Sequence, residues 1–116
     1  MSDTRRILLV EDDVLIGMML ADMFDALDLP EPAQATSNDE ALAIIAAEPL
    51  AGALVDINLG DEKGWPVADA LAERDIPFAF TSGGGDVLPP AHAHRKLVTK
   101  PFRISDIEAA LDEFGA

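Results

Sequence analysis

Two short apolar runs that end abruptly in acidic residues constrain the fold of this chain more than any other feature. Residues 7–10 are followed at once by the acidic triplet 11–13, and residues 53–55 are followed by Asp56 and, shortly after, by Gly60. Such a run is typical of a buried strand that delivers a carboxylate to the end of a sheet. Two of them in one small domain predict carboxylates that converge on a positively charged group.

The composition limits the size of the fold and the classes of partner. A chain of 116 residues supports one domain with one core, and a hydrophobic fraction of 49% is too high for a disordered chain. The formal net charge of −14 repels a phosphate backbone. We therefore expect no direct nucleic-acid binding, and we expect divalent cations and basic protein surfaces as partners instead.

Membrane and export signals are missing from the sequence. No apolar stretch approaches the ~20 residues that cross a bilayer, and residues 1–6 lead into too few apolar residues for a signal peptide. The chain has no cysteine, so it has no disulfide framework and no thiolate metal site. We expect a cytoplasmic protein that does not contact a membrane.

Segments typical of strands and of helices alternate along the chain. We expect strands at residues 5–10, 33–36, 53–56, 78–82 and 96–99, and helices at residues 14–28, 37–48, 66–74 and 105–114. The pairs Ser37/Glu40 and Ser105/Glu108 fit capping boxes at two helix starts, and residues 58–64 are expected to form a loop. This alternation predicts an α/β fold, a doubly wound five-stranded parallel sheet covered on both faces.

Polar side chains follow the predicted strands at the edge of the sheet where open α/β folds bind their ligands. Five of them fall at strand ends: Glu11, Asp12, Asp56, Ser82 and Lys100. Mg²⁺ takes oxygen ligands from one or two carboxylates, from water and from a phosphoryl oxygen. Lys100 supplies a positive charge for a phosphoryl group and Ser82 a hydroxyl donor. With the metal bound, Asp56 could attack phosphorus and become an acyl phosphate.

Four motifs, in this order, resemble the signature of the receiver domains of two-component response regulators. They are Leu8-Leu9-Val10-Glu11-Asp12-Asp13, Val55-Asp56-Ile57-Asn58-Leu59, Phe80-Thr81-Ser82-Gly83 and Thr99-Lys100-Pro101-Phe102. None is specific alone, but together they cover essentially the whole chain. The resemblance implies a flavodoxin-like (CheY-like) fold and a single receiver domain over residues 1–116 with no effector domain.

The resemblance also implies a role for each site residue. Asp56 would accept phosphate from a histidine kinase or a histidine phosphotransfer protein, and the phosphorylated domain would signal to an unknown downstream protein by contact. Ser82 would be the switch hydroxyl and Lys100 the family's invariant lysine. Mg²⁺ would be held by four residues: Asp12, Asp56, the backbone carbonyl of Asn58 and, through water, Glu11.

Two positions admit a second assignment. Asp13 could replace Asp12 as metal ligand, but alignment from Val10 assigns Asp12 and leaves Asp13 to stabilise the helix start, an effect of up to about 1 kcal/mol. Thr81 could replace Ser82 as the switch hydroxyl. Counting along the strand from Pro77 favours Ser82 and turns Thr81 to the opposite face.

The segment between Ser82 and Lys100 departs from the family pattern. Residues 83–95 contain three glycines and two prolines, and these destabilise a helix interior by about 1 and 3 kcal/mol each. We therefore expect the fourth helix of a receiver to be shortened or replaced by a loop. Gly83 is expected to let a backbone amide approach the phosphoryl group, and Pro101 to form the turn after the lysine.

Residues 77–83 make the chain look like a divergent member of the alphaproteobacterial single-domain receivers with a Phe-Ala-Thr-Gly motif. Leu97 stands where the family has its aromatic switch residue, so the usual coupling to that residue cannot operate unchanged. His92 and His94, in a segment without a third ligand, are expected to be exposed to solvent rather than to bind a metal.

Apolar residues at the edge of the first helix leave two interpretations open. Leu15, Met18 and Met19 either pack in the core or form an exposed patch, beside Pro101 and Phe102, on which a kinase or phosphotransfer helix docks.

Three functions are compatible with the residues. A phosphoacceptor receiver, which is a signalling protein and not an enzyme, is favoured. A Mg²⁺-dependent phosphatase with an aspartyl nucleophile is the second, although Asn58 stands where the haloacid-dehalogenase pattern needs a general acid. A pseudo-receiver that binds a partner without phosphorylation is the third.

Overall fold

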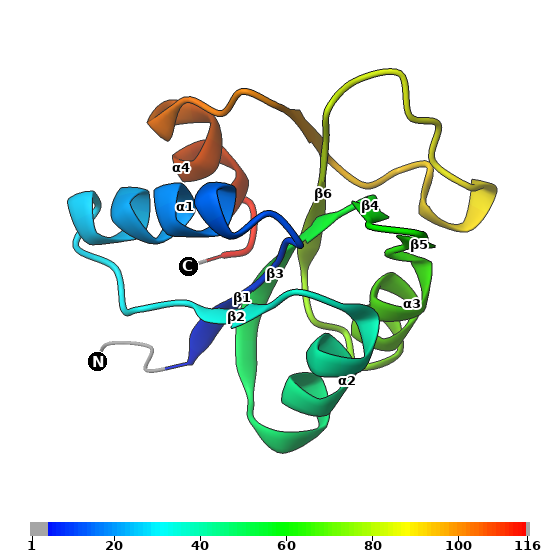
Figure 1. The fold of residues 1–116 in the computed structure, drawn as a ribbon. Coiled ribbons are helices and arrows are strands. Elements are labelled where there is room, and N and C mark those ends of the chain that lie inside the picture. The colour runs from blue at the N-terminus through cyan, green and yellow to red at the C-terminus, as the bar shows by residue number, and fades with distance from the viewer. Residues whose placement is uncertain (1–4, 116) are drawn as a thin grey trace.

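The computed structural model, drawn in Figure 1, describes residues 5–115. Residues 1–4, part of the segment in which we expect no signal peptide, and residue 116 lie outside the described residues. Five parallel strands form the central sheet in the order β2-β1-β3-β6-β7. Their bounds are β1 (Arg6–Val10), β2 (Ala33–Ala35), β3 (Leu50–Asp56), β6 (Phe78–Ser82) and β7 (Leu97–Thr99). The predicted doubly wound sheet is confirmed.

Helices cover both faces of the sheet, as Figure 1 shows. One face packs against α1 (Val14–Ala26) and α4 (Ile104–Asp112), with a core that contains Phe24, Leu54 and Ile107. The other face packs against α2 (Asn38–Ala47) and α3 (Trp65–Glu73), with a core around Val55 and Phe80. Strand β3 lies in the middle of the sheet, and six of its seven residues are buried. Burial from both sides explains why its sequence is a continuous apolar run.

The chain changes direction across the sheet between β1 and β3. From β1 it first goes to β2 at one edge, and then crosses to β3 on the opposite side of β1. Such a switch point opens a crevice at the carboxyl ends of the two strands. The residues that follow β1 and end β3 are Glu11 and Asp56, so the topology alone brings these carboxylates together.

Helix starts follow the sequence only in part. Asp13 caps α1 by accepting hydrogen bonds from the amides of Leu15 (2.9 Å) and Ile16 (3.4 Å), which confirms its predicted structural role. Ser37 caps α2 as expected, but the Glu40 side chain of the predicted box accepts a hydrogen bond from the amide of Thr36, at 2.8 Å. The predicted capping box at Ser105 and Glu108 is wrong.

Helix α4 begins two residues after Phe102, earlier than the Ser105 box implies. Asp106 lies in its first turn and accepts a hydrogen bond from the amide of Arg103 at 3.0 Å. Ser105 and Glu108 are therefore exposed helical positions. The sequence pattern missed this start because the residue that precedes α4 is an arginine, which has no side-chain acceptor for a cap.

Two connections differ in detail from expectation. Residues 58–64, predicted to be a loop, contain a small antiparallel hairpin of β4 (Asn58–Leu59) and β5 (Glu62–Lys63). The connection from β6 to β7 has no α-helix and only one 3-10 turn, η1 (Pro90–His92), so the expected loss of a helix there is confirmed. Among residues 5–115, no helix is both long and apolar enough to cross a membrane.

Candidate functional site

Glu11, Asp56 and Lys100 form an ion-paired group at the crevice between β1 and β3. Lys100 follows β7, and its Nζ donates hydrogen bonds to Asp56 Oδ2 at 2.8 Å and to Glu11 Oε1 at 2.9 Å. Glu11 and Asp56 are buried, with 6% and 3% of their surface exposed. Two buried carboxylates therefore share one ammonium group, which leaves a surplus of negative charge in the crevice.

Burial and this charge surplus shift the protonation of the group. Burial, reinforced by the hydrogen bond with Asp56, raises the pKa of Glu11 to about 8, against the opposing effect of Lys100. Burial lowers the pKa of Lys100, but its hydrogen bonds to Asp56 and Glu11 outweigh burial and leave that pKa raised. Lys100 is thus held in its charged form, and the protonated form of Glu11 is favoured while no cation neutralises the crevice.

The acidic residues of the crevice fit a hard divalent cation. Oxygens of Glu11, Asp12 and Asp56 lie within 4.8 Å of one another. Asp12 is exposed, whereas Glu11 Oε2 is buried and has no hydrogen-bond partner. An all-oxygen set with an unpartnered buried oxygen is what Mg²⁺ accepts, with water completing its coordination.

A second network of hydrogen bonds surrounds Ser82 at the end of β6. The Ser82 hydroxyl donates to Asp86 and accepts a hydrogen bond from the amide of Gly84 at 2.9 Å. The Asn58 side-chain amide lies 3.2 Å from both carboxylate oxygens of Asp86, and Lys63 donates to the Asn58 side-chain oxygen. The hydrogen bond from Ser82, followed by that from Asn58, lowers the pKa of Asp86 and keeps this carboxylate charged.

Asn58 links the two networks, because its backbone amide also donates to Asp56 Oδ1 at 3.2 Å. The predicted site residues Glu11, Asp12, Asp56 and Lys100 are therefore close together, with Asn58 and Ser82 beside them. Asp86 was missed by the sequence pattern. The only available signal was its position as the first charged residue after the three glycines.

Several solved structures are similar to this chain, and receiver domains are among them. SdrG from Sphingomonas melonis Fr1 is 39% identical, with a TM-score of 0.86 over 100% of both chains. A structure described as the BeF3-activated conformation of SdrG is 40% identical, with a TM-score of 0.80 over 97% of each chain. The REC domain of the PhyR response regulator from Erythrobacter litoralis is 30% identical, with a TM-score of 0.75 over 95% of this chain and 88% of the other.

The chain belongs to the receiver domains of response regulators. A CheY-like receiver from Methanospirillum hungatei JF-1, 26% identical with a TM-score of 0.81 over 97% of this chain and 98% of the other, has the same fold. No family model and no curated protein matches the sequence. The receiver fold and a role in response-regulator signalling thus rest on the structural relatives and on the geometry of the crevice.

Pro101 follows Lys100 and Gly83 follows Ser82, and both were assigned roles beside the site. The peptide bond between Lys100 and Pro101 is cis. Gly83 is exposed, and it is the amide of Gly84, not Gly83, that binds the Ser82 hydroxyl. The approach of the Gly83 amide to a phosphoryl group stays a prediction.

The candidate docking residues divide into exposed and buried members. Leu15 and Met18 are 76% and 58% exposed, so the core-packing interpretation is wrong for both. Met19 is partly exposed, at 36%, and Phe102 is buried, at 7%. An apolar pocket lies at this place, lined by Ile16, Met19, Lys100, Pro101 and Phe102. Because Lys100 lines this pocket, the apolar surface adjoins the acidic crevice.

His92 does not have the solvent exposure expected of it. Only 4% of its surface is exposed, and its ring packs edge-on against Phe78 and Phe80 at centroid distances of 5.8 and 5.7 Å. Its Nε2 lies 2.8 Å from Asp69 Oδ1 on α3. Because no α-helix lies between β6 and β7, the His92 ring covers the two phenylalanines. His94 is exposed, as predicted.

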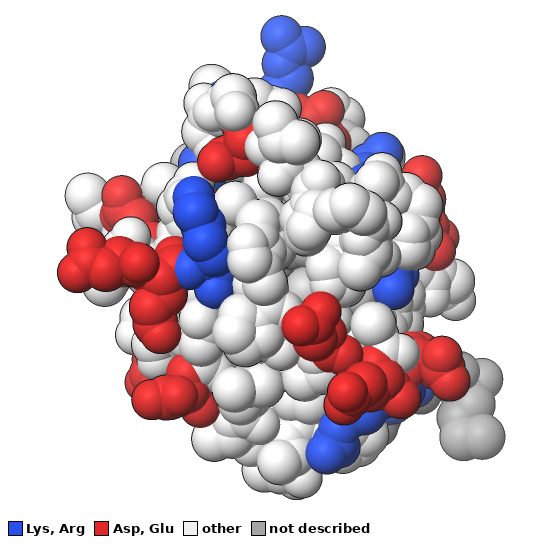
Figure 2. Space-filling view, turned by 90° about the vertical axis from the view of Figure 1, so that its right-hand side faces the viewer, with Lys and Arg blue, Asp and Glu red and all other residues white. Residues whose placement is uncertain are grey.

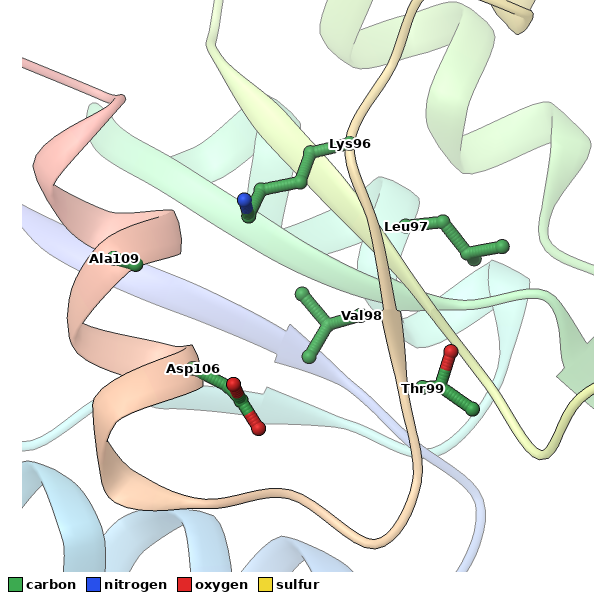
Figure 3. Close-up of a pocket in the computed structure, with 6 residues that line it drawn as sticks. All are labelled: Lys96, Leu97, Val98, Thr99, Asp106 and Ala109. Carbon is green, nitrogen blue, oxygen red and sulfur yellow. The ribbon is translucent and has the colours of Figure 1, made fainter.

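A separate hollow lies between the edge strand β7 and helix α4, as shown in Figure 3. Lys96 and Val98 point toward α4 in this view, whereas Leu97 and Thr99 point away from it. The residues that line the hollow are Lys96, Leu97, Val98, Thr99, Asp106 and Ala109. None of the predicted site residues is among them, so this hollow is distinct from the crevice.

Proposed function

We propose that this receiver is a phosphoacceptor in which Asp56 takes a phosphoryl group from a phosphohistidine of a histidine kinase or a histidine phosphotransfer protein. The observation that carries the proposal is the contact of Lys100 Nζ with Asp56 Oδ2 at 2.8 Å, within an acidic cluster that has an unpartnered buried oxygen. In the reaction an Asp56 oxygen bonds to phosphorus and the phosphorus–nitrogen bond breaks; the histidine ring, protonated beforehand on its other nitrogen, keeps the bonding electron pair and leaves as a neutral imidazole.

Each neighbour of Asp56 has a defined part in this proposal. Glu11, Asp12, Asp56 and the Asn58 carbonyl would hold Mg²⁺, which neutralises the acidic cluster and a phosphoryl oxygen. Lys100 already contacts the Asp56 oxygen and supplies a positive charge to the phosphoryl group. Ser82 offers a hydroxyl at the end of the neighbouring strand. The protein would act in the cytoplasm as a signalling protein, by contact with a downstream target and not by turnover of a substrate.

Phosphorylation by a small donor tests the proposal. Wild type incubated with Mg²⁺ and acetyl phosphate should gain one phosphoryl group by intact-mass spectrometry, and Asp56→Ala should gain none. Asp112→Asn, which removes an exposed acid on α4, is the matched control and should behave as wild type. An adduct that persists in Asp56→Ala would exclude Asp56 as acceptor. Steady turnover of a generic phosphoester would instead favour the phosphatase, and an absent adduct the pseudo-receiver.

The apolar surface at Leu15, Met18 and Met19, next to the pocket beside Lys100, is the proposed docking site for the phosphate donor. Leu15→Asp should slow phosphotransfer from a cognate kinase about tenfold or more, because it places a charge in an apolar contact. Phosphorylation by acetyl phosphate, which needs no docking, should not change. Equal slowing with both donors would place Leu15 in the chemistry or the fold and not in docking.

A further inference from the structure

The carboxylate of Asp86 lies where the Ser82 side of the crevice offers hydrogen-bond donors to an anion. It accepts hydrogen bonds from the Ser82 hydroxyl and from the Asn58 side-chain amide. Lys63 and Lys100 both act on it electrostatically and stabilise its charge. Asp86 is not part of the acidic cluster of Glu11, Asp12 and Asp56 that fits a cation, among the residues the structure describes. Its surroundings are those of a bound anion.

These donors are also the ones that a phosphoryl group on Asp56 needs. A serine hydroxyl has a single hydrogen, so it can be donated to one acceptor at a time. In this structure the hydrogen goes to Asp86. A phosphoryl group that takes the Ser82 hydroxyl must therefore break the bond between Ser82 and Asp86.

We propose that Asp86 is a built-in competitor of the phosphoryl group: its carboxylate holds the Ser82 hydroxyl before phosphorylation and is displaced from it afterwards. The proposal rests on Asp56 being the phosphoacceptor. Asp86 acts through Ser82, so it is a positioning residue and not a catalytic one. It sets how tightly the phosphorylated state is held, because part of the energy of the new hydrogen bond goes into breaking the old one.

The backbone around Asp86 is built to let the carboxylate leave. Gly84 and Gly85 have φ angles of +112° and +78°, and a Cβ atom added at either of them would meet nothing within 4 Å. At the far end of the segment, His92 is buried and bound to Asp69. The backbone of residues 83–88 can therefore change conformation at the glycines, while His92 holds the far end of the segment in place.

Beryllofluoride, a phosphoryl mimic, provides the test. In the presence of Mg²⁺, Asp86→Asn and Asp86→Ala should bind beryllofluoride about five- to tenfold more tightly than wild type, because the charged competitor is gone. Glu108→Gln, which removes an exposed acid on α4, is the control for net charge and should bind as wild type. Affinities of Asp86→Asn and Glu108→Gln that are equal would overturn the proposal.

Two further measurements separate competition from other roles of Asp86. In a Ser82→Ala background, Asp86→Asn should no longer change the beryllofluoride affinity. If the gain persists there, Asp86 acts by simple repulsion of the ligand, and the proposal is wrong. The Mg²⁺ affinity of Asp86→Asn should equal that of wild type, and a loss would make Asp86 a metal ligand instead.

Failure of the inference can be told from failure of the proposed function. If wild type binds no beryllofluoride and forms no adduct with acetyl phosphate, Asp56 is not a phosphoacceptor and both proposals fall. If wild type binds and only the Asp86 variants lack the gain, the phosphoacceptor stands and the competitor falls. In the free protein, nitrogen-15 relaxation should show faster motion at Gly83–Gly85 in Asp86→Ala than in wild type. Unchanged motion would count against the proposal that the hydrogen bond between Ser82 and Asp86 holds this segment in place.

Discussion

At the scale of single residues, Glu11 is the group whose charge depends most on what occupies the crevice. Its pKa stands at about 8, raised from its ordinary value of 4.5 mainly by burial. Between these two pH values the folded protein holds a proton that the unfolded chain has released. The free energy of unfolding of the metal-free protein should therefore fall as pH rises from about 4.5 to about 8.

Chemical denaturation in metal-free buffer at pH 5 and at pH 8 checks this sign. Wild type should lose about 3 kcal/mol more than Glu11→Gln across the interval, because the variant has no proton to release. Repulsion among the other acids affects both proteins alike and cancels in the comparison. Parallel losses in the two proteins would show that Glu11 is ionised throughout.

Residues at strand ends were predictable, and residues on loops were not. Asp56 and Lys100 follow apolar runs, and the geometry of a parallel sheet brings such positions to one edge. Asp86 and His92 reach their places only because an irregular segment folds back over the sheet. No periodicity encodes that path, so the exposure predicted for His92 was simply that of a polar residue in a loop.

At the scale of elements, the connection from β6 to β7 has no α-helix, and the buried His92 ring covers the sheet in its place. His92→Ala should lower the free energy of unfolding by about 2–3 kcal/mol, because it leaves a cavity over Phe78 and Phe80 and removes the bond to Asp69. His94→Ala, an exposed neighbour, should change stability by less than about 0.5 kcal/mol. Urea denaturation measures both, and equal effects would contradict the role given to His92.

Elements with a clear period were predicted well. The five strands and four helices are where alternation and amphipathic spacing place them, and β3 is longer than predicted because Leu50–Gly52 were not distinguished from the preceding turn. The small β4–β5 hairpin was missed because two-residue strands carry no readable alternation. The start of α4 was misplaced because serine is a frequent cap, and here Asp106 supplies the bond.

At the scale of the whole molecule, negative charge dominates. Figure 2 shows the side with α3 and the β6–β7 connection, where acidic side chains gather toward both flanks of the view around a neutral middle. With a net charge of −14, repulsion opposes the folded state, and salt should relieve it. Mg²⁺ should do more than screen, because a cation that binds only the folded state adds its binding free energy.

Thermal unfolding in MgCl₂ and in NaCl at equal ionic strength separates the two effects. Wild type should be more stable in MgCl₂ by about 1–2 kcal/mol once Mg²⁺ exceeds its Kd about tenfold. Asp12→Asn should lose most of this excess and keep the response to NaCl. Equal stabilisation of wild type by both salts would mean that the crevice holds no specific cation.

The glycine-rich connection also has a consequence for speed. Loops rearrange within nanoseconds to microseconds, whereas shifts of a packed helix take microseconds to milliseconds. The segment next to Ser82 is a loop with three glycines, and the described connection from β6 to β7 has no α-helix to reposition. A partner that binds this surface would thus find the rearranged loop almost as soon as Asp56 is phosphorylated. The encounter with the phosphate donor, and not the conformational change, would then limit the rate of the signal.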